Sequence, residues 1–367
     1  MGSYAKTWAD QYDFQPEVAH NLPLAIDDMS LAFHLGIHNK TLWWCILGGD
    51  LTTEYRKKTK DATVYGNERL YKVFQIPKSD GRKRDIQNPV IRLKNVQRAL
   101  LVSFLNHIPL GDHVGAYVPG RSCAETAKKH IGKGLIISLD IRDFFPSVKQ
   151  SMIRKVFQKM GYNRNVASLI SGLVVYRNFL PQGAPTSGFI ANLVADHLFD
   201  RQIIEALQKL DPRWVYTRYS DDIDVSHPEM QLRETIEKII ELVKVKANAA
   251  GFKLNTKKTK VEPYWHRQQV LGMVVNKKLS VPRAEYARLR CLIHNCTVHG
   301  FESQFARADQ KSVAALYLHI AGKLNYFSQV DREKGEKLAK LYQLAVEIHK
   351  PENTVNEVDF GTDDDAN

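Results

Sequence analysis

The spacing of apolar and polar residues divides the chain into successive regions. Short alternating segments surround one helical stretch in residues 71–134, and strands alternate with helices in residues 135–275. The pattern is helical and rich in basic residues over 276–350. Residues 1–70 are predicted to form a helical extension. Residues 351–367 form an acidic tract, which predicts a disordered tail.

A β-hairpin and a helix are predicted within residues 71–134. Apolar residues alternate over Tyr71–Ile76 and Asp85–Val90, which predicts two strands. Asp80 and Gly81 stand between them and form a dipeptide typical of hairpin turns. A helix over Leu93–Ile108 is expected to follow.

Three strands and three helices are predicted in the region that follows. The apolar run Gly134–Leu139 predicts a buried strand that ends at Asp140, and Trp214–Tyr219 and Ile223–Ser226 predict two strands around the turn 220–222. The predicted helices run from Ser147 through about Met160, onward from the segment Pro185–Gly188 that precedes the second helix, and from Leu232 to Ala250. Ser147 and Gln150 have the spacing of a capping box, which places the first helix start at Ser147.

Composition narrows the class of protein. Hydrophobic residues make up 44% and charged residues 25% of the 367 residues, as in ordinary globular chains. No apolar run approaches the roughly 20 residues that cross a bilayer, and the N-terminus lacks a signal pattern. We therefore expect a cytoplasmic protein with no membrane partner.

The four cysteines predict no disulfide framework. Cys291, His294, Cys296 and His299 hold metal-ligating side chains, but their spacing is too tight for a usual zinc finger and falls in a helical stretch. We interpret the cysteines as reduced core or surface residues.

The charge is uneven along the chain. Removing the six acids of residues 352–367 raises the net charge from +12 for the whole chain to +18 for residues 1–351. A body this basic favours a polyanionic partner, most often nucleic acid. Solubility alone is the alternative explanation of the basic charge.

Three acidic residues stand at positions that bound divalent cations would explain. Asp140 ends an apolar strand, and Asp221 and Asp222 lie side by side in a predicted turn. Adjacent carboxylates repel each other unless divalent cations neutralise them. If the strands are neighbours, the three carboxylates converge and can hold two Mg²⁺ ions for phosphoryl transfer. Taken singly, each acid is better explained as an exposed turn carboxylate.

These acids belong to a series of motifs that resembles reverse transcriptases. The series, in order, is the basic segment Lys78–Arg84, then Ser138–Ser147, Leu180–Ser187, Tyr219–Asp222, Leu254–Thr259 and Val270–Gly272. The resemblance implies an α+β fold, the right-hand polymerase with fingers, an antiparallel palm sheet with helices, and a helical thumb. It places the fingers at 71–134, the palm and primer grip at 135–275 with finger elements in 150–180, and the thumb at 276–350.

The resemblance also implies roles at the metal site. Asp140 matches the first metal-binding carboxylate, joined by the main-chain carbonyl of Ile141. Asp221 matches the second carboxylate and Asp222 an auxiliary one. Phe145 matches the steric gate, a ring that leaves no room for a ribose 2′-hydroxyl, while Phe144 is expected to pack in the core.

Further roles concern the nucleotide and the leaving group. Gln182 and Gly183 match the nucleotide pocket, and Lys78 and Arg84 match residues that grip the triphosphate. Lys258 matches a lysine that protonates the departing pyrophosphate. Lys257 and Lys260 remain rivals for that role.

The remaining implied roles concern the nucleic acid. Leu271 and Gly272 match the primer grip. Arg121 is expected to touch template or nucleotide, with a plain surface loop as the alternative, and Arg288 and Arg290 are expected to follow RNA backbone.

Among reverse transcriptases the chain looks most like bacterial retron-type enzymes. Their accessory Asn-Ala-x-x-His motif appears here as Thr126 to His130, their Val-Thr-Gly as Val270 to Gly272, and Gly188 stands where proline is usual. The retron reading implies DNA synthesis from dNTPs on part of a bound structured noncoding RNA, an RNA–DNA hybrid product and a role in anti-phage defence. An effector protein from the same operon is a further partner to test.

Two alternatives stay open. One is another defence-associated or group II intron-derived reverse transcriptase with different priming. The other is an RNA-binding scaffold or toxin inhibitor, although the intact Asp140, Asp221 and Asp222 argue against a dead enzyme.

Overall fold

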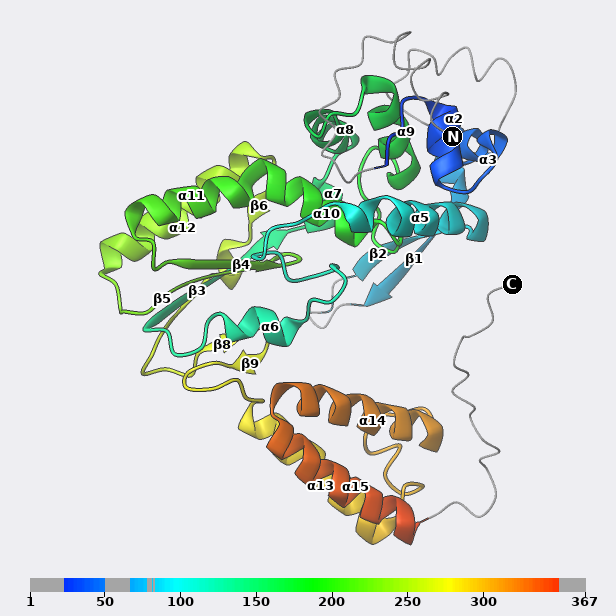
Figure 1. Cartoon of the computed structure of the whole chain (residues 1–367). Helices are drawn as coiled ribbons and strands as arrows, with labels where there is room; N and C mark the ends of the chain where they lie inside the picture. Colours follow the sequence, from blue (N-terminus) through cyan, green and yellow to red (C-terminus); the bar gives the residue numbers. More distant parts are fainter. Residues whose placement is uncertain (1–22, 50–66, 78–80, 82, 350–367) are drawn as a thin grey trace, which may run out of the picture. The chain divides into compact units, whose positions relative to one another are not determined.

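The computed structural model describes residues 23–49, 67–77, 81 and 83–349 (Figure 1). The acidic tail and Lys78 therefore lie outside the described residues, as does much of the N-terminal extension. The chain divides into two compact units, residues 1–271 and 272–367.

A five-stranded antiparallel sheet forms the centre of the first unit. Its strands are β3 (Leu135–Arg142), β4 (Val215–Tyr219), β5 (Asp222–His227), β6 (Lys253–Leu254) and β7 (Lys260–Pro263). β3 pairs with β5, β6 and β7, and β4 pairs with the other edge of β5. β3 is buried along most of its length, which agrees with its uninterrupted apolar sequence.

Helices cover the sheet and extend beyond it. They are α6 (Cys123–Lys128), α7 (Phe144–Ser147), α8 (Gln150–Lys159), α9 (Arg164–Val174), α10 (Ser187–Ala195), the π-helical turn η3 (Asp196–Asp200), α11 (Arg201–Leu210) and α12 (Arg233–Ala249). In Figure 1, α11 and α12 run along one face of the sheet and α6 lies on the other side. The predicted end of α12 is confirmed, since Gly251 follows it with a φ of 87°.

A two-stranded hairpin follows a short 3₁₀ turn in the described segment after residue 66. Its strands are β1 (Tyr71–Pro77) and β2 (Lys83–Pro89), preceded by the 3₁₀ turn η1 (Asn67–Leu70) and followed by α5 (Ile91–Ser103) and the 3₁₀ turn η2 (Leu105–His107). Tyr71 pairs with Pro89 and Pro77 with Lys83, which confirms the predicted hairpin. Two short helices, α2 (Asp28–His34) and α3 (Asn39–Ile46), belong to the N-terminal extension.

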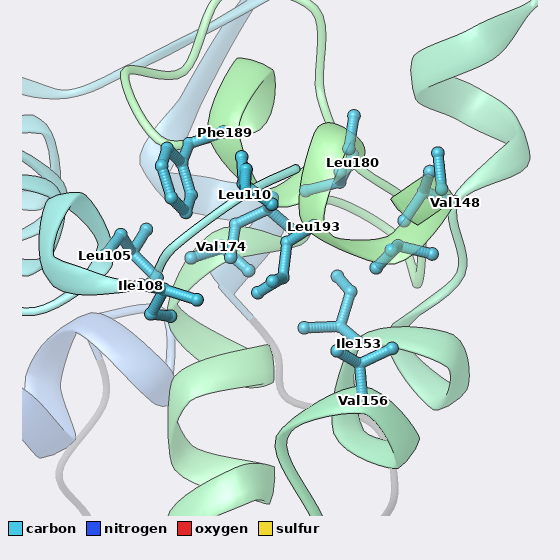
Figure 2. Packing of buried hydrophobic residues seen from close by; sticks show 14 of the residues in the cluster. Leu105, Ile108, Leu110, Val148, Ile153, Val156, Val174, Leu180, Phe189 and Leu193 are labelled. Atoms are coloured by element: carbon cyan, nitrogen blue, oxygen red, sulfur yellow. The ribbon is translucent and has the colours of Figure 1, made fainter. Parts of the chain in front are cut away.

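A continuous apolar core joins α8, α9 and α10 to neighbouring loops (Figure 2). The labelled side chains are all nearly or fully buried: Leu105, Ile108, Leu110, Val148, Ile153, Val156, Val174, Leu180, Phe189 and Leu193. This core fixes α10 next to the strand that carries Asp140, because α10 also contacts α7 directly after β3.

The start of α8 differs from the prediction. The helix begins at Gln150 with Lys149 as its N-cap residue, and Ser147 instead ends the single turn α7. The Ser147 hydroxyl donates to the carbonyl oxygen of Asp143 at 2.9 Å. Ser147 therefore closes the turn behind it and does not cap the helix ahead of it.

The second unit is helical, as predicted for this region. It contains the short strand β9 (Met273–Val274) and the helices α13 (Arg283–His299), α14 (Val313–Val330) and α15 (Arg332–Ile348). α15 packs on both other helices. Phe301 stacks on Tyr317 with ring centroids 4.3 Å apart. Cys296 is buried on α13, whereas Cys291 is exposed. Within the described ranges, no helix is long and apolar enough to span a bilayer.

His130 connects the segment after α6 to the sheet. Its Nδ1 lies 2.7 Å from the Ser226 hydroxyl on β5, and its Nε2 lies 2.8 Å from the Thr217 hydroxyl on β4. Hydroxyl groups satisfy a neutral imidazole in either tautomer. Burial, reinforced by Lys133 and Lys129, lowers the pKa of His130 to about 3.

This burial predicts a pH-dependent stability. The unfolded chain binds a proton at His130 below about pH 6.5 and the folded chain does not, so stability is lost as the pH falls from there toward 3. Between pH 7 and 5 the loss from this residue is about 2 kcal/mol. We expect His130→Asn to lower stability at pH 7 and to flatten this decline in urea unfolding. The exposed substitution His107→Asn is the control. A decline as steep in His130→Asn as in the wild type would contradict the assignment.

Candidate active site

The sheet register brings the three acidic residues together. β3 and β5 are neighbours, and Asp140 lies directly opposite Asp222. Asp221 belongs to the turn between β4 and β5, where Ser220 has a φ of 60°. The Ile141 amide donates to the Asp221 carbonyl oxygen at 2.8 Å. The end of β3 and the turn are therefore held together by backbone contacts, which place the carboxylates at one edge of the sheet.

The electrostatics of this edge favour a bound cation. Burial raises the pKa of Asp222 to about 6, and the charges of Asp221 and Asp140 add to the effect. Oxygen ligands clustered against their own repulsion are the donor set that Mg²⁺ and similar hard cations use. The residues present therefore fit a divalent metal site.

Lys258 already supplies part of the countercharge. It ends the 3₁₀ turn η4 (Thr256–Lys258), and its Nζ lies 2.7 Å from Oδ2 of Asp140. This hydrogen bond raises the pKa of the lysine, so it is a cation at neutral pH. Lys257 lines a cleft beside these carboxylates, and Lys260 begins β7.

A cleft of about 880 Å³ joins the carboxylates to the predicted nucleotide residues. Its lining includes Arg84, Tyr117, Asp140, Ile141, Phe145, Gln182, Asp221 and Lys258. A second cavity of about 500 Å³ shares Arg84, Tyr117, Phe145 and Gln182 and adds Gly183. Elements far apart in the sequence, from β2 to η4, therefore converge on one space.

The two phenylalanines after Asp140 have different surroundings. Phe144 is buried and packs on Phe252 with ring centroids 5.8 Å apart. Phe145 is partly buried, lies 5.7 Å from the Phe144 ring and lines the cleft. This is the arrangement that a core residue followed by a gate residue would have.

Gln182 and Gly183 lie against β2. The Gln182 amide donates to Oε1 of Gln87 at 2.8 Å, and the Gln87 amide donates to the Gln182 carbonyl oxygen at 2.8 Å. A Cβ at Gly183 would lie 3.0 Å from the Ile86 side chain and 3.1 Å from the Gln87 carbonyl oxygen, and φ is 125°. Glycine is therefore needed here for the close approach of β2.

The other predicted residues are spread over both units. Arg84 lies on β2 opposite Ile76, is exposed and lines the cleft. Leu271 and Gly272 have positive φ values of 52° and 79° and stand at the boundary between the units. Arg288 and Arg290 are exposed on α13 in the second unit.

Arg121 has an internal role that its sequence did not predict. Its guanidinium donates to the carbonyl oxygens of Leu110, Gly111 and Val114 at 2.6–2.8 Å. These contacts fasten the loop that precedes α6. A contact of Arg121 with nucleic acid stays a prediction.

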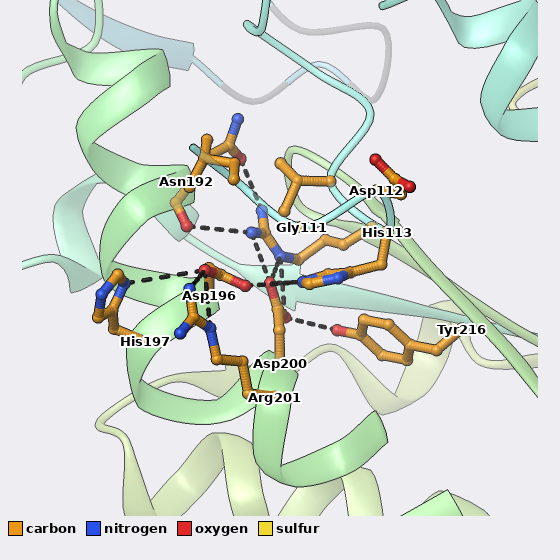
Figure 3. A network of polar contacts seen from close by, with 12 residues as sticks. Gly111, Asp112, His113, Asn192, Asp196, His197, Asp200, Arg201 and Tyr216 are labelled. Carbon is orange, nitrogen blue, oxygen red and sulfur yellow. Dashed lines mark hydrogen bonds and ion pairs between the residues drawn. The ribbon is translucent and has the colours of Figure 1, made fainter. Parts of the chain in front are cut away.

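Sequence reasoning missed a buried polar network that contacts the turn carrying Asp221 (Figure 3). Arg218 on β4 is fully buried and its Nη2 donates to Oδ2 of Asp200 at 2.7 Å. Its Nη1 donates to Oδ1 of Asn192 at 2.7 Å and to the Ser220 carbonyl oxygen at 3.0 Å. Arg218 thus links α10 and η3 to the turn that carries Asp221.

His113 completes this network. Its Nε2 lies 2.8 Å from Oδ1 of Asp196 and 3.6 Å from Oδ2 of Asp200. Burial lowers the pKa of His113, but its contacts with the two carboxylates raise it above the ordinary value overall.

His113, Asp196 and Asp200 have ligand atoms within 4.8 Å of one another, the spacing of a possible metal site. However, Arg218 contacts Asp200, and Arg201 Nη2 lies 2.7 Å from Oδ2 of Asp196. Two guanidinium groups already neutralise these carboxylates, so we interpret the group as a structural ion network. A charged residue on the core face of a predicted strand, as Arg218 is, was the signal that could have revealed it.

The comparisons with known proteins identify the family. Residues 76–275 match the family model described as reverse transcriptase (RNA-dependent DNA polymerase). The chain belongs to this family, so the prediction made from the motif order is confirmed, as is the α+β fold class. Enzymes of this family need divalent metal ions, in agreement with the carboxylate edge.

Curated relatives are retron reverse transcriptases. The chain is 31% identical over 290 residues to the retron Mx65 reverse transcriptase of Myxococcus xanthus, and the aligned residues cover 74% of this chain and 64% of that protein. It is 28% identical over 301 residues to the retron Ec86 reverse transcriptase of Escherichia coli, covering 77% and 88%. Retron Mx162 reverse transcriptase of M. xanthus is 32% identical over 256 residues, covering 61% and 52%. The predicted likeness to retron-type enzymes is confirmed, although the chain spans less than two thirds of both M. xanthus relatives.

The Arg218 network predicts a large effect on stability. We expect Arg218→Met to lower the free energy of unfolding by about 3–5 kcal/mol, because it leaves the buried Asp200 without its partner. The control is Arg213→Met, whose half-exposed contact with Asp211 is screened by solvent and should contribute far less to stability. Urea unfolding of both variants measures the difference. Equal losses in the two variants would show that the buried pair carries no special weight.

Proposed function

We propose that this chain is an RNA-directed DNA polymerase that copies part of a bound structured noncoding RNA into DNA, as a retron in anti-phage defence. One observation carries the polymerase reading. Asp140, opposite Asp222 and beside Asp221, borders a cleft that Phe145 and Gln182 also line. The retron relatives support the narrower reading.

In this proposal Asp140, Asp221, Asp222 and the carbonyl of Ile141 hold two Mg²⁺ ions. When bound, these ions lower the pKa of an attacking 3′-hydroxyl and offset charge on the leaving pyrophosphate. Lys258 lies within reach of the same carboxylates and carries the proton that the pyrophosphate takes up.

The other cleft residues select and hold the nucleotide. Phe145 excludes a 2′-hydroxyl, Gln182 and Gly183 form the nucleotide pocket, and Arg84 binds the triphosphate together with Lys78. Charge-assisted, bidentate contacts suit an arginine in that role. Leu271 and Gly272 hold the primer end, and Arg121, Arg288 and Arg290 are proposed contacts with RNA.

The proposed partners follow from this chemistry. They are a structured noncoding RNA, the RNA–DNA hybrid, dNTPs and an effector protein from the same operon. We place the enzyme in the cytoplasm, where the RNA and dNTPs are found.

The metal role of Asp221 can be separated from RNA binding. We expect Asp221→Asn to reduce DNA synthesis from dNTPs and Mg²⁺ by at least about 100-fold, because it removes a carboxylate ligand. Retention of labelled RNA on a filter should stay at the wild-type level. Asp309→Asn is the matched control, since Asp309 is exposed and asparagine tolerates its φ of 55°. Wild-type synthesis by Asp221→Asn, or release of its RNA, would overturn the assignment.

The nucleic acid that copurifies with the full chain tests the retron reading. We expect a hybrid in which DNA is joined to RNA through a 2′-linkage. Debranching enzyme should separate the DNA from the RNA. DNase and RNase, applied to separate aliquots, should then each digest a different fragment. Unbranched or protein-linked DNA would favour another defence-associated class. RNA without DNA would contradict a retron product.

A further inference from the structure

Tyr117 is held in a strained backbone conformation beside the cleft. Its φ of 54° lies in the left-handed region that tyrosine rarely adopts. The segment around it is fixed on two sides: the Gly115 amide donates to the Arg218 carbonyl oxygen at 2.8 Å, and Nδ2 of Asn192 donates to the Ala116 carbonyl oxygen at 2.5 Å. Such strain persists where the surroundings determine it, often at functional sites.

The ring of Tyr117 rests on Gly188. A Cβ built at Gly188 would meet Cγ of the ring, with Cδ1 and Cδ2 at 2.7 and 2.8 Å. Gly188 lies in the first turn of α10, where the helical backbone accepts alanine. What excludes a side chain at this position is therefore the Tyr117 ring. This accounts for glycine at position 188 in this chain.

The same ring also contacts Phe145. The two ring centroids are 6.1 Å apart at 62°, an edge-to-face arrangement that is favourable for aromatic pairs. Phe144 contacts Phe145 as well, at 5.7 Å, and is itself fixed against Phe252. Tyr117 is 54% exposed and lines both cavities that Phe145 lines. Phe145 thus contacts both a buried ring, Phe144, and a partly exposed ring that lines the cleft, Tyr117.

We propose that Tyr117 is a specificity-determining residue that, seated on Gly188, holds the Phe145 ring in place as the sugar gate. A gate ring rejects a 2′-hydroxyl only if it cannot move aside, because the hydroxyl is small. Phe144 limits movement toward the core, and Tyr117 limits movement on the cleft side. The inference rests on the proposed polymerase function and adds a positioning residue to it.

The test measures sugar discrimination, the ratio of kcat/KM for a dNTP to that for the matching rNTP. The full-length chain is assayed on an RNA template with a DNA primer and Mg²⁺. We expect Tyr117→Ala to lower this ratio about tenfold, and Tyr117→Phe, which keeps the ring, to stay within about twofold of the wild type. General damage to the fold would reduce both substrates alike and leave the ratio unchanged.

Gly188 supplies the second half of the test. Gly188→Ala should lower the ratio as Tyr117→Ala does, because the new Cβ displaces the ring. The double variant should be no worse than Tyr117→Ala alone, since the clash is then gone. Gly322→Ala on α14 is the matched control, because a Cβ there meets nothing within 4 Å, and it should leave the ratio unchanged.

Phe145→Ala separates failure of this inference from failure of the proposed function. If Phe145→Ala lowers the ratio and Tyr117→Ala does not, the role of Tyr117 is refuted while the gate stands. Additive losses in the Gly188→Ala/Tyr117→Ala double variant would also refute it. If the wild type makes no DNA, or Phe145→Ala keeps full discrimination, the proposed function of the cleft itself is wrong.

Discussion

The repulsion between three carboxylates at one edge of the sheet is the constraint on which the site depends. Antiparallel pairing of β3 with β5 sets Asp140 opposite Asp222, and the turn adds Asp221 beside them. Like charges at this spacing would push the strands apart if side chains alone decided the geometry. Backbone contacts oppose this, among them those from Ile141 to Asp221 and from Asn255 to the Asp140 carbonyl oxygen at 2.7 Å.

A second set of charged and polar residues, centred on Arg218, stabilises the same turn. Arg218 is one residue away from the strand end and holds the Ser220 carbonyl oxygen, while Asn192 and Asp200 accept from its other donors. These partners lie on one continuous helical segment, where α10 passes through the π-helical turn η3 into α11. Such turns are frequent at functional sites. Here the segment carries acceptors that fix Arg218, which in turn holds the turn that carries Asp221.

Local patterns were enough to predict much of the fold. The paired strands β1 and β2, the buried strand β3 and the strands around Ser220 follow from apolar runs, period-two alternation and turn residues, which act over a few positions. The helix start at Ser147 was wrong because a serine can hydrogen-bond backward as well as forward, and here its hydroxyl donates to Asp143. The sequence holds no local signal that decides between these two outcomes.

The parts that sequence reasoning missed need residues from distant segments. His113, Asp196 and Arg218 belong to three separate elements, and only the folded sheet brings them together. The same holds for Tyr117 on Gly188, and for Arg121, whose guanidinium donates to three loop carbonyl oxygens. The carboxylates were predictable because each belongs to a short motif. The order of these motifs along the chain can be recognised without knowing how the intervening segments fold.

Lys258 shows how the two charge systems connect to catalysis. Its ammonium neutralises Asp140 at 2.7 Å, yet the lysine side chain is 57% exposed and sits on a short 3₁₀ turn. An exposed, flexible cation holds its partner only weakly compared with a buried, bidentate one such as Arg218. In the proposed mechanism Asp140 would exchange this countercharge for a divalent cation without disturbing the fold. The released lysine would then remain at the edge of the cleft as the proposed proton donor. Arg218 is thus a buried cation that fixes the turn, whereas Lys258 is an exposed cation that lines the cleft.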